Sequence, residues 1–373
     1  MLSRLQDFLS RHRRKLVVTG ALVGGTIYAA RYARRKLVEY QEKQARDFFE
    51  RTRRMHHFES TERTCNQVIL GMGEEMCQAV LKECSTDELL EQLRQNPSNK
   101  LELWEQMKIV SFTRLATFIY ASSMLVIALR VQLNLLGGYI YRDIMNEQSQ
   151  ITDELKQQYL SLIRHFITDD GITDLARYIR TKVLEVLKAM PLTRQLSLAD
   201  TEQIFWSLQM AINGDTRHDP NSRMSKYLLP DVSRVQQRKN CSPQLLQMYN
   251  ETLDLLESED CVSVCSQNVS RGFVLSCDAI AESMGDSLQQ LAPSESVNKE
   301  SSSSQTNNNN LLNINTVLLA LAKIIPIISG LTSRGYDSAA RPHSLATQLL
   351  SFYVVAEKSK MLGANVYETF SSG

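Results

Sequence analysis

Residues 109–141 read IVSFTRLATFIYASSMLVIALRVQLNLLGGYIY, and this stretch decides the fold. The run between Arg114 and Arg130 carries no charge, which is also typical of a membrane-spanning helix. Arginines at both ends of that run, together with apolar residues sustained at helical spacing, favour a buried central helix instead. We expect Gly137 and Gly138 to break or end this helix.

The rest of the chain has few residues that break helices, with eight prolines and fifteen glycines in 373 residues. Leucine-rich segments recur at helical spacing, and no run alternates as a strand would. The segment TVLLALAKIIPIISGL (316–331) is interrupted by Lys323 and Pro326, which predicts a kinked core helix. The sequence therefore predicts an all-α fold, in which an N-terminal membrane anchor is followed by one elongated cytosolic helical bundle.

Two stretches look loosely structured. Residues 213–231 are rich in turn formers, and residues 293–310, PSESVNKESSSSQTNNNN, form a low-complexity linker. We expect neither of them to divide the bundle into separate domains.

Charge is concentrated at the N-terminus although the formal net charge is only +1. Residues 1–36 hold nine basic side chains against one acid, Asp7, so the remainder is net acidic. That balance argues against a nucleic-acid-binding surface spread over the protein. Seven irregularly spaced cysteines without a CxxC pair indicate reduced thiols in a cytosolic setting. Cys261 and Cys265 lie one turn apart with no histidine nearby, so we expect buried thiols and no metal site.

The apolar run LVVTGALVGGTIYAA (16–30) lies between two basic clusters. It spans roughly 22 Å as a helix, and flanking tyrosines and arginines can extend it to the interfaces of a bilayer about 30 Å thick. A secretory signal peptide and a mitochondrial presequence are alternatives. An uncleaved anchor is favoured because a basic cluster follows at once and the cysteine usage is not secretory. We divide the chain into a basic segment (1–15), an anchor (16–33) and a helical domain (34–373).

The charged segment 40–64 leads away from the anchor, and we expect it to form one long helix that joins the bundle and holds it off the membrane. Further on, Asn99 with Glu102 forms a capping-box pattern that places the helix start near Lys100. Helical spacing then puts Trp104 on one stripe between Lys100 and Lys108, away from the apolar stripes. This favours an exposed indole, although lysine stems flanking a partly buried indole fit the spacing too.

Most catalytic signatures are absent from the sequence, which has no P-loop, GxGxxG, HExxH or GxSxG motif. His165 and Asp170 match the H-x-x-x-x-D spacing of membrane-bound glycerolipid acyltransferases, where the carboxylate orients a histidine base. That spacing arises easily by chance, and we expect His165 to lie at a solvated helix end. The sequence thus indicates a binding protein with no catalytic residue, no cofactor and no metal.

Five longer segments resemble the animal peroxin-three family: HFESTERTCN (57–66), PSNKLELWE (97–105), LRVQLNLLGGYIY (129–141), LAKIIPIISG (321–330) and ANVYETF (364–370). The resemblance covers most of the chain, and it thins at residues 206–240 and in the Ser/Asn-rich linker. It implies a peroxisome biogenesis factor anchored in the peroxisomal membrane by its N-terminus, with the helical domain in the cytosol. The bundle is then expected to dock the soluble receptor-chaperone peroxin-nineteen, which carries newly made membrane proteins.

The resemblance also implies which residues act. In the family, an amphipathic helix of the receptor lies in a hydrophobic groove at the membrane-distal end of the bundle, anchored by a tryptophan that corresponds to Trp104. Lys100 and Lys108 would flank it, and Leu93 and Ile140 would form groove walls. The membrane-targeting residues would be Arg11, Arg13, Arg14, Lys15, Arg31, Arg34, Arg35 and Lys36, working with the anchor and membrane lipids.

Experiments can distinguish three alternative functions of the chain. A docking scaffold without catalysis predicts that function survives exchange of His165, whereas an acyltransferase using His165 and Asp170 predicts its loss. A mitochondrial outer-membrane protein of similar build would send a reporter fused to residues 1–40 to mitochondria. We expect neither nucleic acid nor a small-molecule substrate as partner.

Overall fold

The structure of the protein is a computed structural model that describes residues 2–237, 241–291, 317–333 and 344–372, with the side chains of residues 2–21, 23 and 286–291 outside the description. It contains two compact units, Met1–His57 and Phe58–Gly373, called unit 1 and unit 2 below. Residues 34–57, grouped with the helical domain in the sequence-based division, therefore belong to unit 1. The predicted linker 293–310 lies outside the described residues.

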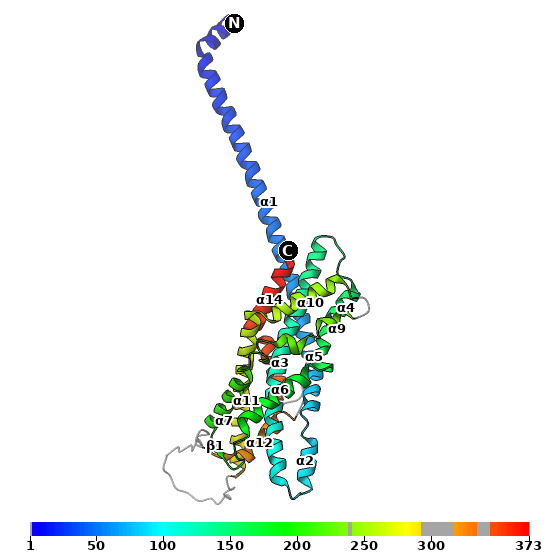
Figure 1. The fold of residues 1–373 in the computed structure, drawn as a ribbon. Helices are drawn as coiled ribbons and strands as arrows, with labels where there is room; N and C mark the ends of the chain where they lie inside the picture. The colour runs from blue at the N-terminus through cyan, green and yellow to red at the C-terminus, as the bar shows by residue number, and fades with distance from the viewer. Residues whose placement is uncertain (1, 238–240, 292–316, 334–343, 373) are drawn as a thin grey trace, which may run out of the picture. The chain divides into compact units, whose positions relative to one another are not determined.

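The described chain is almost entirely helical, as predicted (Figure 1). The elements in chain order are α1 (Leu2–Glu83), α2 (Asp87–Arg94), α3 (Lys100–Met145), α4 (Asp153–Leu160), η1 (Ser161–Ile163), α5 (Arg164–Thr168), α6 (Gly171–Leu187), β1 (Gln195–Leu196), α7 (Leu198–Asn213), α8 (Met224–Leu228), α9 (Val232–Gln236), α10 (Pro243–Leu256), α11 (Glu259–Leu291), β2 (Leu319–Ala320), α12 (Leu321–Leu331), α13 (Leu345–Val355) and α14 (Glu357–Ser371).

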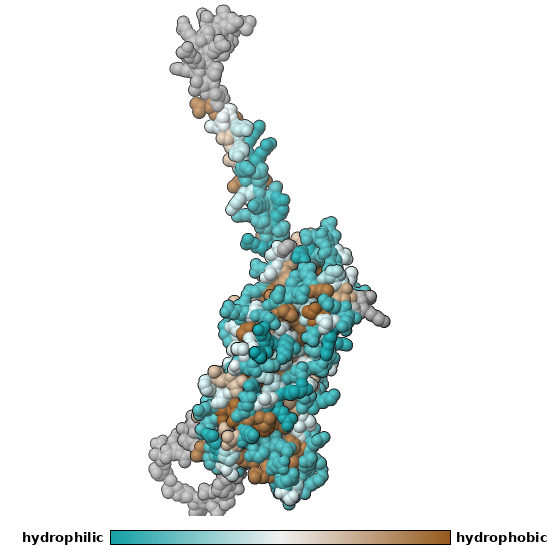
Figure 2. All heavy atoms as spheres, viewed as in Figure 1, coloured by the Kyte–Doolittle hydropathy of each residue, from teal (hydrophilic) through white to brown (hydrophobic). Residues whose placement is uncertain are grey.

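The central helix of unit 2 is α3, whose 46 residues include the apolar stretch 109–141. Every residue from Ser111 to Tyr139 is buried. Among the described residues, α3 is the one helix long and apolar enough to cross a membrane, and its apolar window lies wholly inside unit 2. The prediction of a buried core helix is thus confirmed. Outside this core, hydrophilic side chains cover much of the visible face of unit 2 (Figure 2).

Gly137 and Gly138 do not end α3, and that prediction was wrong. The helix runs through both glycines to Met145, because their missing side chains make room for neighbouring helices. A Cβ at Gly137 would lie 2.7 Å from the Thr61 side chain of α1, and one at Gly138 would lie 2.7 Å from Cβ of Phe370 on α14. The glycine pair therefore permits close helix packing instead of a turn.

A buried arginine joins α1, α3 and the α13–α14 region. Arg130 of α3 is fully buried and pairs with Glu62 of α1. Its guanidinium also donates to Asn66 Oδ1 at 2.7 Å and to the carbonyl oxygen of Val354 at 2.8 Å. Aromatic contacts continue the junction, with Phe58 5.2 Å from Tyr367 and Tyr139 stacked 5.5 Å from Phe370 between ring centroids. Three of the segments that carry the family resemblance thus meet in one packing junction.

Two other expectations need correction. The predicted helix over 316–331 begins only at Leu321, since Leu319 and Ala320 pair antiparallel with Gln195 and Leu196. Pro326 lies inside α12, on its exposed side.

The stretch 213–231 is ordered, contrary to the expectation of a loose segment. It contains α8, and Tyr227 is buried with its hydroxyl donating to the carbonyl oxygen of His218 at 2.8 Å. The turn-forming residues do form turns, and the buried side chains of Met224 and Leu228 pack this segment against the core.

All seven cysteines are free in the structure, as the sequence predicted. Six are buried and Cys241 is half-buried. No group of histidine, cysteine or acidic side chains that could hold a metal ion occurs among the described residues.

Candidate docking surface

The turn between α2 and α3 positions the predicted binding residues (Figure 1). Asn96 adopts a φ of 54°, a left-handed conformation that asparagine tolerates better than most residues. The helix begins at Lys100, as predicted, with Asn99 at the N-cap. The capping box does not form, however, because Asn99 has non-extended backbone angles and its side chain accepts no capping hydrogen bond.

Trp104 is half-buried. Its indole packs against the hydrophobic core, while its neighbours Leu103 and Met107 are buried completely. Of the two arrangements that the spacing allowed, the structure has the partly buried one. An anchored ring with one accessible side is held in a defined orientation, which is what a binding residue needs.

Lys108 is buried, which rules it out as a surface cation beside Trp104. Its side chain is 0% exposed, and its Nζ donates to the carbonyl oxygen of Met190 at 2.7 Å and pairs with Glu105 at 2.6 Å. A buried ammonium requires such partners because its desolvation is costly. The prediction failed because the turn that follows α6 covers this side of α3. Lys100, in contrast, is exposed as expected.

Apolar side chains around the turn complete the candidate site. Leu93 is partly buried and packs against the core, as does Leu89. Leu101 is 71% exposed, and Leu90 is also exposed. We call Leu90, Leu93, Leu101 and Trp104, with Lys100 at the edge, the α2–α3 surface. Sequence reasoning missed Leu90 and Leu101 as members of this surface.

Ile140 does not belong to this surface. It lies 36 residues beyond Trp104 on the same helix, which at 1.5 Å per residue separates the two by about 54 Å. Ile140 is partly buried against the core close to the junction formed by Tyr139 and Phe370. The two residues cannot line one groove, so this part of the predicted site needs correction.

A polar network fixes the position of α2. Arg114 of α3 is buried and donates to Thr86 at the N-cap of α2 with a distance of 3.2 Å. It also donates to Thr332 Oγ1 at 2.9 Å and to the carbonyl oxygen of Ser329 at 2.8 Å, both next to the end of α12. Burial lowers the pKa of Arg114. The α2–α3 surface is therefore held by a rigid support and not by a free loop.

The second tryptophan, Trp206 on α7, is more exposed than Trp104, at 63%. Met210, one turn further along, is exposed too. Neither residue was predicted from the sequence, and the amphipathic pattern of α7 was the signal that could have found them.

The structure does not assemble the His165–Asp170 pair. The carboxylate near His165 belongs to Asp169, at 3.6 Å from Nδ1, whereas Asp170 stands at the N-cap position of α6 without a capping hydrogen bond and pairs with Arg234 at 3.4 Å. His165 is also buried rather than solvated, which corrects the expectation of an exposed helix end. The spacing that resembled an acyltransferase thus does not produce the geometry of a base with its orienting carboxylate.

The predicted targeting residues lie on α1. Arg31, Arg34, Arg35 and Lys36 are exposed, and Lys36 pairs with Glu39 at 2.9 Å. The side chains of Arg11, Arg13, Arg14 and Lys15, and those of residues 16–21 and 23 in the apolar run 16–30, fall outside the described part of the chain. The backbone of the whole segment is helical.

Comparison with known proteins finds relatives that align with the whole chain. A model of the Peroxin-3 family matches residues 7–100, 95–144 and 141–334. The chain is 34% identical to peroxisomal biogenesis factor 3 of Rattus norvegicus and 35% identical to that of Homo sapiens, with 100% of this chain and 98% of each relative covered. Peroxisome biogenesis protein 3-1 of Arabidopsis thaliana is 28% identical over 49% of this chain and 57% of that protein. These relatives are named for peroxisome biogenesis and not for a reaction, and this chain, whose role is in peroxisome biogenesis, belongs to the Peroxin-3 family.

Proposed function

We propose that this protein is the membrane-anchored docking factor for the receptor-chaperone peroxin-nineteen, and that the α2–α3 surface binds an amphipathic helix of that receptor. The role enables the targeting and insertion of peroxisomal membrane proteins and involves no catalysis. The observation that carries the proposal is the half-buried Trp104 beside exposed Leu101 on a rigid helix end.

The chemistry of the α2–α3 surface fits helix recognition. An amphipathic helix binds through a few apolar anchors at helical spacing, and tryptophan is enriched among the residues that dominate such interfaces. Trp104 and Leu93 offer half-buried apolar walls, and Leu101 and Leu90 offer apolar area that binding would cover. Lys100 is the exposed cation that acidic residues of an incoming helix would meet, and such charges mainly raise the association rate.

The position within unit 2 supports docking away from the anchor. The chain enters unit 2 at Phe58, which contacts Tyr367 near the C-terminal end of α3. The α2–α3 surface lies at the opposite end of that helix (Figure 1). A receptor bound there would lie far from the point at which the chain enters unit 2.

The direct test is the affinity for the N-terminal helix of peroxin-nineteen, measured by isothermal titration calorimetry. Trp104→Ala should weaken binding by on the order of 2 to 4 kcal/mol, which is roughly 30- to 1,000-fold in Kd. Trp206→Ala is the matched control, since it removes an even more exposed indole from a different helix. Equal losses in both variants, or no loss in the first, would reject the α2–α3 surface.

Fluorescence provides an independent check. In the Trp206→Phe protein, Trp104 is the sole indole, so its emission reports the site alone. We expect intermediate emission that moves to the blue and becomes protected from a soluble quencher when the receptor helix is added. Emission that the helix leaves unchanged would place docking elsewhere on unit 2.

The anchor and the absence of catalysis are tested in cells. A reporter fused to residues 1–40 should reach the peroxisomal membrane, and protease added outside intact peroxisomes should digest unit 2 if it faces the cytosol as a single-pass protein.

His165→Ala should leave import of peroxisomal membrane proteins intact. Loss of import in a folded His165→Ala protein would instead support the acyltransferase alternative.

A further inference from the structure

The part of α1 that lies in unit 1 carries an exposed apolar face. Leu37, Val38, Phe48, Phe49 and Met55 are each between 46% and 70% exposed. Large apolar side chains scattered singly on a surface need no explanation, but contiguous ones mark a binding surface.

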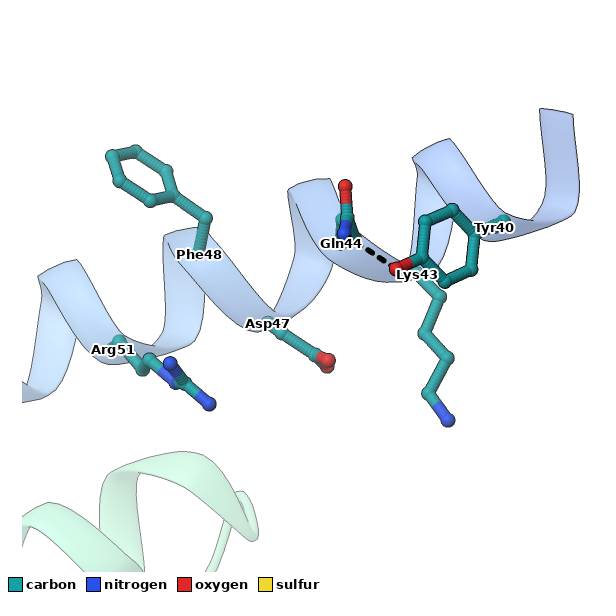
Figure 3. Close-up of a pocket in the computed structure, with 6 residues that line it drawn as sticks. All are labelled: Tyr40, Lys43, Gln44, Asp47, Phe48 and Arg51. Atoms are coloured by element: carbon teal, nitrogen blue, oxygen red, sulfur yellow. Dashed lines mark hydrogen bonds between the residues drawn. The ribbon is translucent and has the colours of Figure 1, made fainter. Parts of the chain in front are cut away.

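These five residues lie on one side of the helix. At 100° per residue they occupy an arc of about 120°, which also contains Gln41, Ala45 and Thr52 but no charged residue between positions 35 and 55. The close-up of this segment shows the division directly, with Phe48 pointing to one side of α1 and Lys43, Asp47 and Arg51 to another (Figure 3). We call the arc with Leu37, Val38, Phe48, Phe49 and Met55 the apolar face of α1.

The width and composition of the arc favour a flat partner over a second helix. A two-stranded coiled coil buries a narrow seam, and along this helix a seam centred on Leu37 and Phe48 would leave Val38 and Phe49 outside it. A broad face with large apolar residues near both of its edges, Phe48 near one and Phe49 at the other, is typical of helices that lie in a membrane interface.

Charge points to the nature of that membrane. Residues 37–55 hold five basic and four acidic side chains, all outside the apolar face, and the basic pair Arg35 and Lys36 directly precedes them. A basic excess opposite an apolar face attracts anionic headgroups. The segment also follows directly on the basic cluster that ends the predicted anchor, so it starts at the membrane surface if that anchor is inserted.

We propose that residues 37–55 of α1 bind an anionic lipid surface, with the apolar face at the acyl boundary and the basic side chains among the headgroups. This adds a lipid-binding site to the docking role, and it replaces the expectation that this helix holds the bundle off the membrane. Because α1 is continuous from Leu2 to Glu83 in the structure, binding requires this helix to bend where the anchor ends, near Ala33 to Lys36. The inference rests on the proposed anchor for its location but not on receptor docking.

The test uses the full chain, reconstituted in vesicles of phosphatidylcholine and phosphatidylserine and labelled with a nitroxide. Six native cysteines are buried, so Cys241→Ser leaves a background suited to an introduced label. Phe48→Cys places the probe on the apolar face, and Asp47→Cys is the matched control on the charged side. We expect position 48 to be more accessible to oxygen than to a water-soluble nickel chelate, and position 47 to show the reverse.

Each other outcome overturns the proposal in a distinct way. Greater accessibility of position 48 to the nickel chelate would mean that the face is in water. Low accessibility of position 48 to both reagents would mean that protein covers the apolar face. If its accessibility then rises on dilution with unlabelled chain, the covering protein is a second copy of this chain. Vesicle flotation tests the membrane anchor separately from the lipid-bound apolar face. A chain that floats with the vesicles but has a water-exposed position 48 rejects the lipid-bound face alone. A chain that does not float rejects the anchor as well.

Discussion

Lys100 and Lys108 stand on one stripe of α3, yet one is exposed and the other is fully buried. Helical spacing gives the side of a helix on which a residue lies, but it does not say which neighbouring element covers that side. Here the turn that contains Met190 covers Lys108 two helical turns into α3, and leaves Lys100 in solvent.

The two lysines should therefore respond differently to truncation. Lys108→Ala leaves the Met190 carbonyl without its donor and should lower the free energy of unfolding by about 1 to 3 kcal/mol. Lys100→Ala should change stability by less than about 0.5 kcal/mol, while slowing receptor association in a salt-dependent way. Urea unfolding followed by circular dichroism, and stopped-flow binding, measure the two effects. Equal stability losses would show that the burial of Lys108 has no energetic consequence.

The buried pair of Arg130 and Glu62 leads to a second prediction at the residue scale, which concerns stability. Arg130→Ala leaves Glu62 largely buried without its partner and should cost about 3 to 5 kcal/mol of unfolding free energy. Replacing both residues by methionine removes both charges and should recover much of that loss. Chemical denaturation of the single and double variants gives the coupling between them, and additive losses would contradict a paired role.

At the scale of elements, replacing a glycine of α3 and replacing a glycine of α1 should change stability in opposite directions. A Cβ at Gly138 would lie 2.7 Å from Cβ of Phe370 and 3.0 Å from its carbonyl carbon, whereas one at Gly71 would meet nothing within 4 Å. Gly138→Ala must push α14 away and should destabilise unit 2 by about 1 to 3 kcal/mol. Gly71→Ala should stabilise α1 by up to about 1 kcal/mol, because alanine favours a helix. Thermal unfolding compares them, and a neutral Gly138→Ala would mean that α14 repacks freely.

The same glycines show where prediction from sequence ends. The apolar length of residues 109–141 was enough to predict a buried central helix, since a run with arginines at both ends suits a protein core. Gly137 and Gly138 looked like a break because sequence alone does not reveal that Thr61 and Phe370 approach them. Trp104 was located correctly on its helix, but its half-buried state depends on packing, and Ile140 was assigned without knowledge that α3 is continuous.

For the whole molecule, the buried cysteines predict how stability depends on pH. Burial raises the pKa of Cys65, Cys261, Cys265 and Cys277 from 9.0 to about 12, and that of Cys84 to about 11. Above pH 9 the unfolded chain loses thiol protons that the folded chain retains, so the unfolding free energy should fall as pH rises from 9 to about 12. Urea unfolding across this range measures the slope, and Cys265→Ala should make it shallower. A flat profile would show that these thiols ionise in the folded protein.

Thiol labelling offers a matching kinetic observation. Only the thiolate reacts rapidly, so we expect one accessible thiol, Cys241, in the native protein and seven after denaturation. Several fast-reacting thiols in the native state would indicate local opening of unit 2.

The packing of α14 on α3 has a consequence for synthesis of the chain. The ribosome releases α3 long before α14, which occupies residues Glu357–Ser371, and Gly138 and Tyr139 have no cover from Phe370 until α14 has been synthesised. During that interval α3 is a long apolar helix that by length and composition could enter a bilayer. A stop codon just before Glu357 would make this interval permanent, so that the loss of the last helix would turn the core of the protein into a substrate for membrane insertion or degradation.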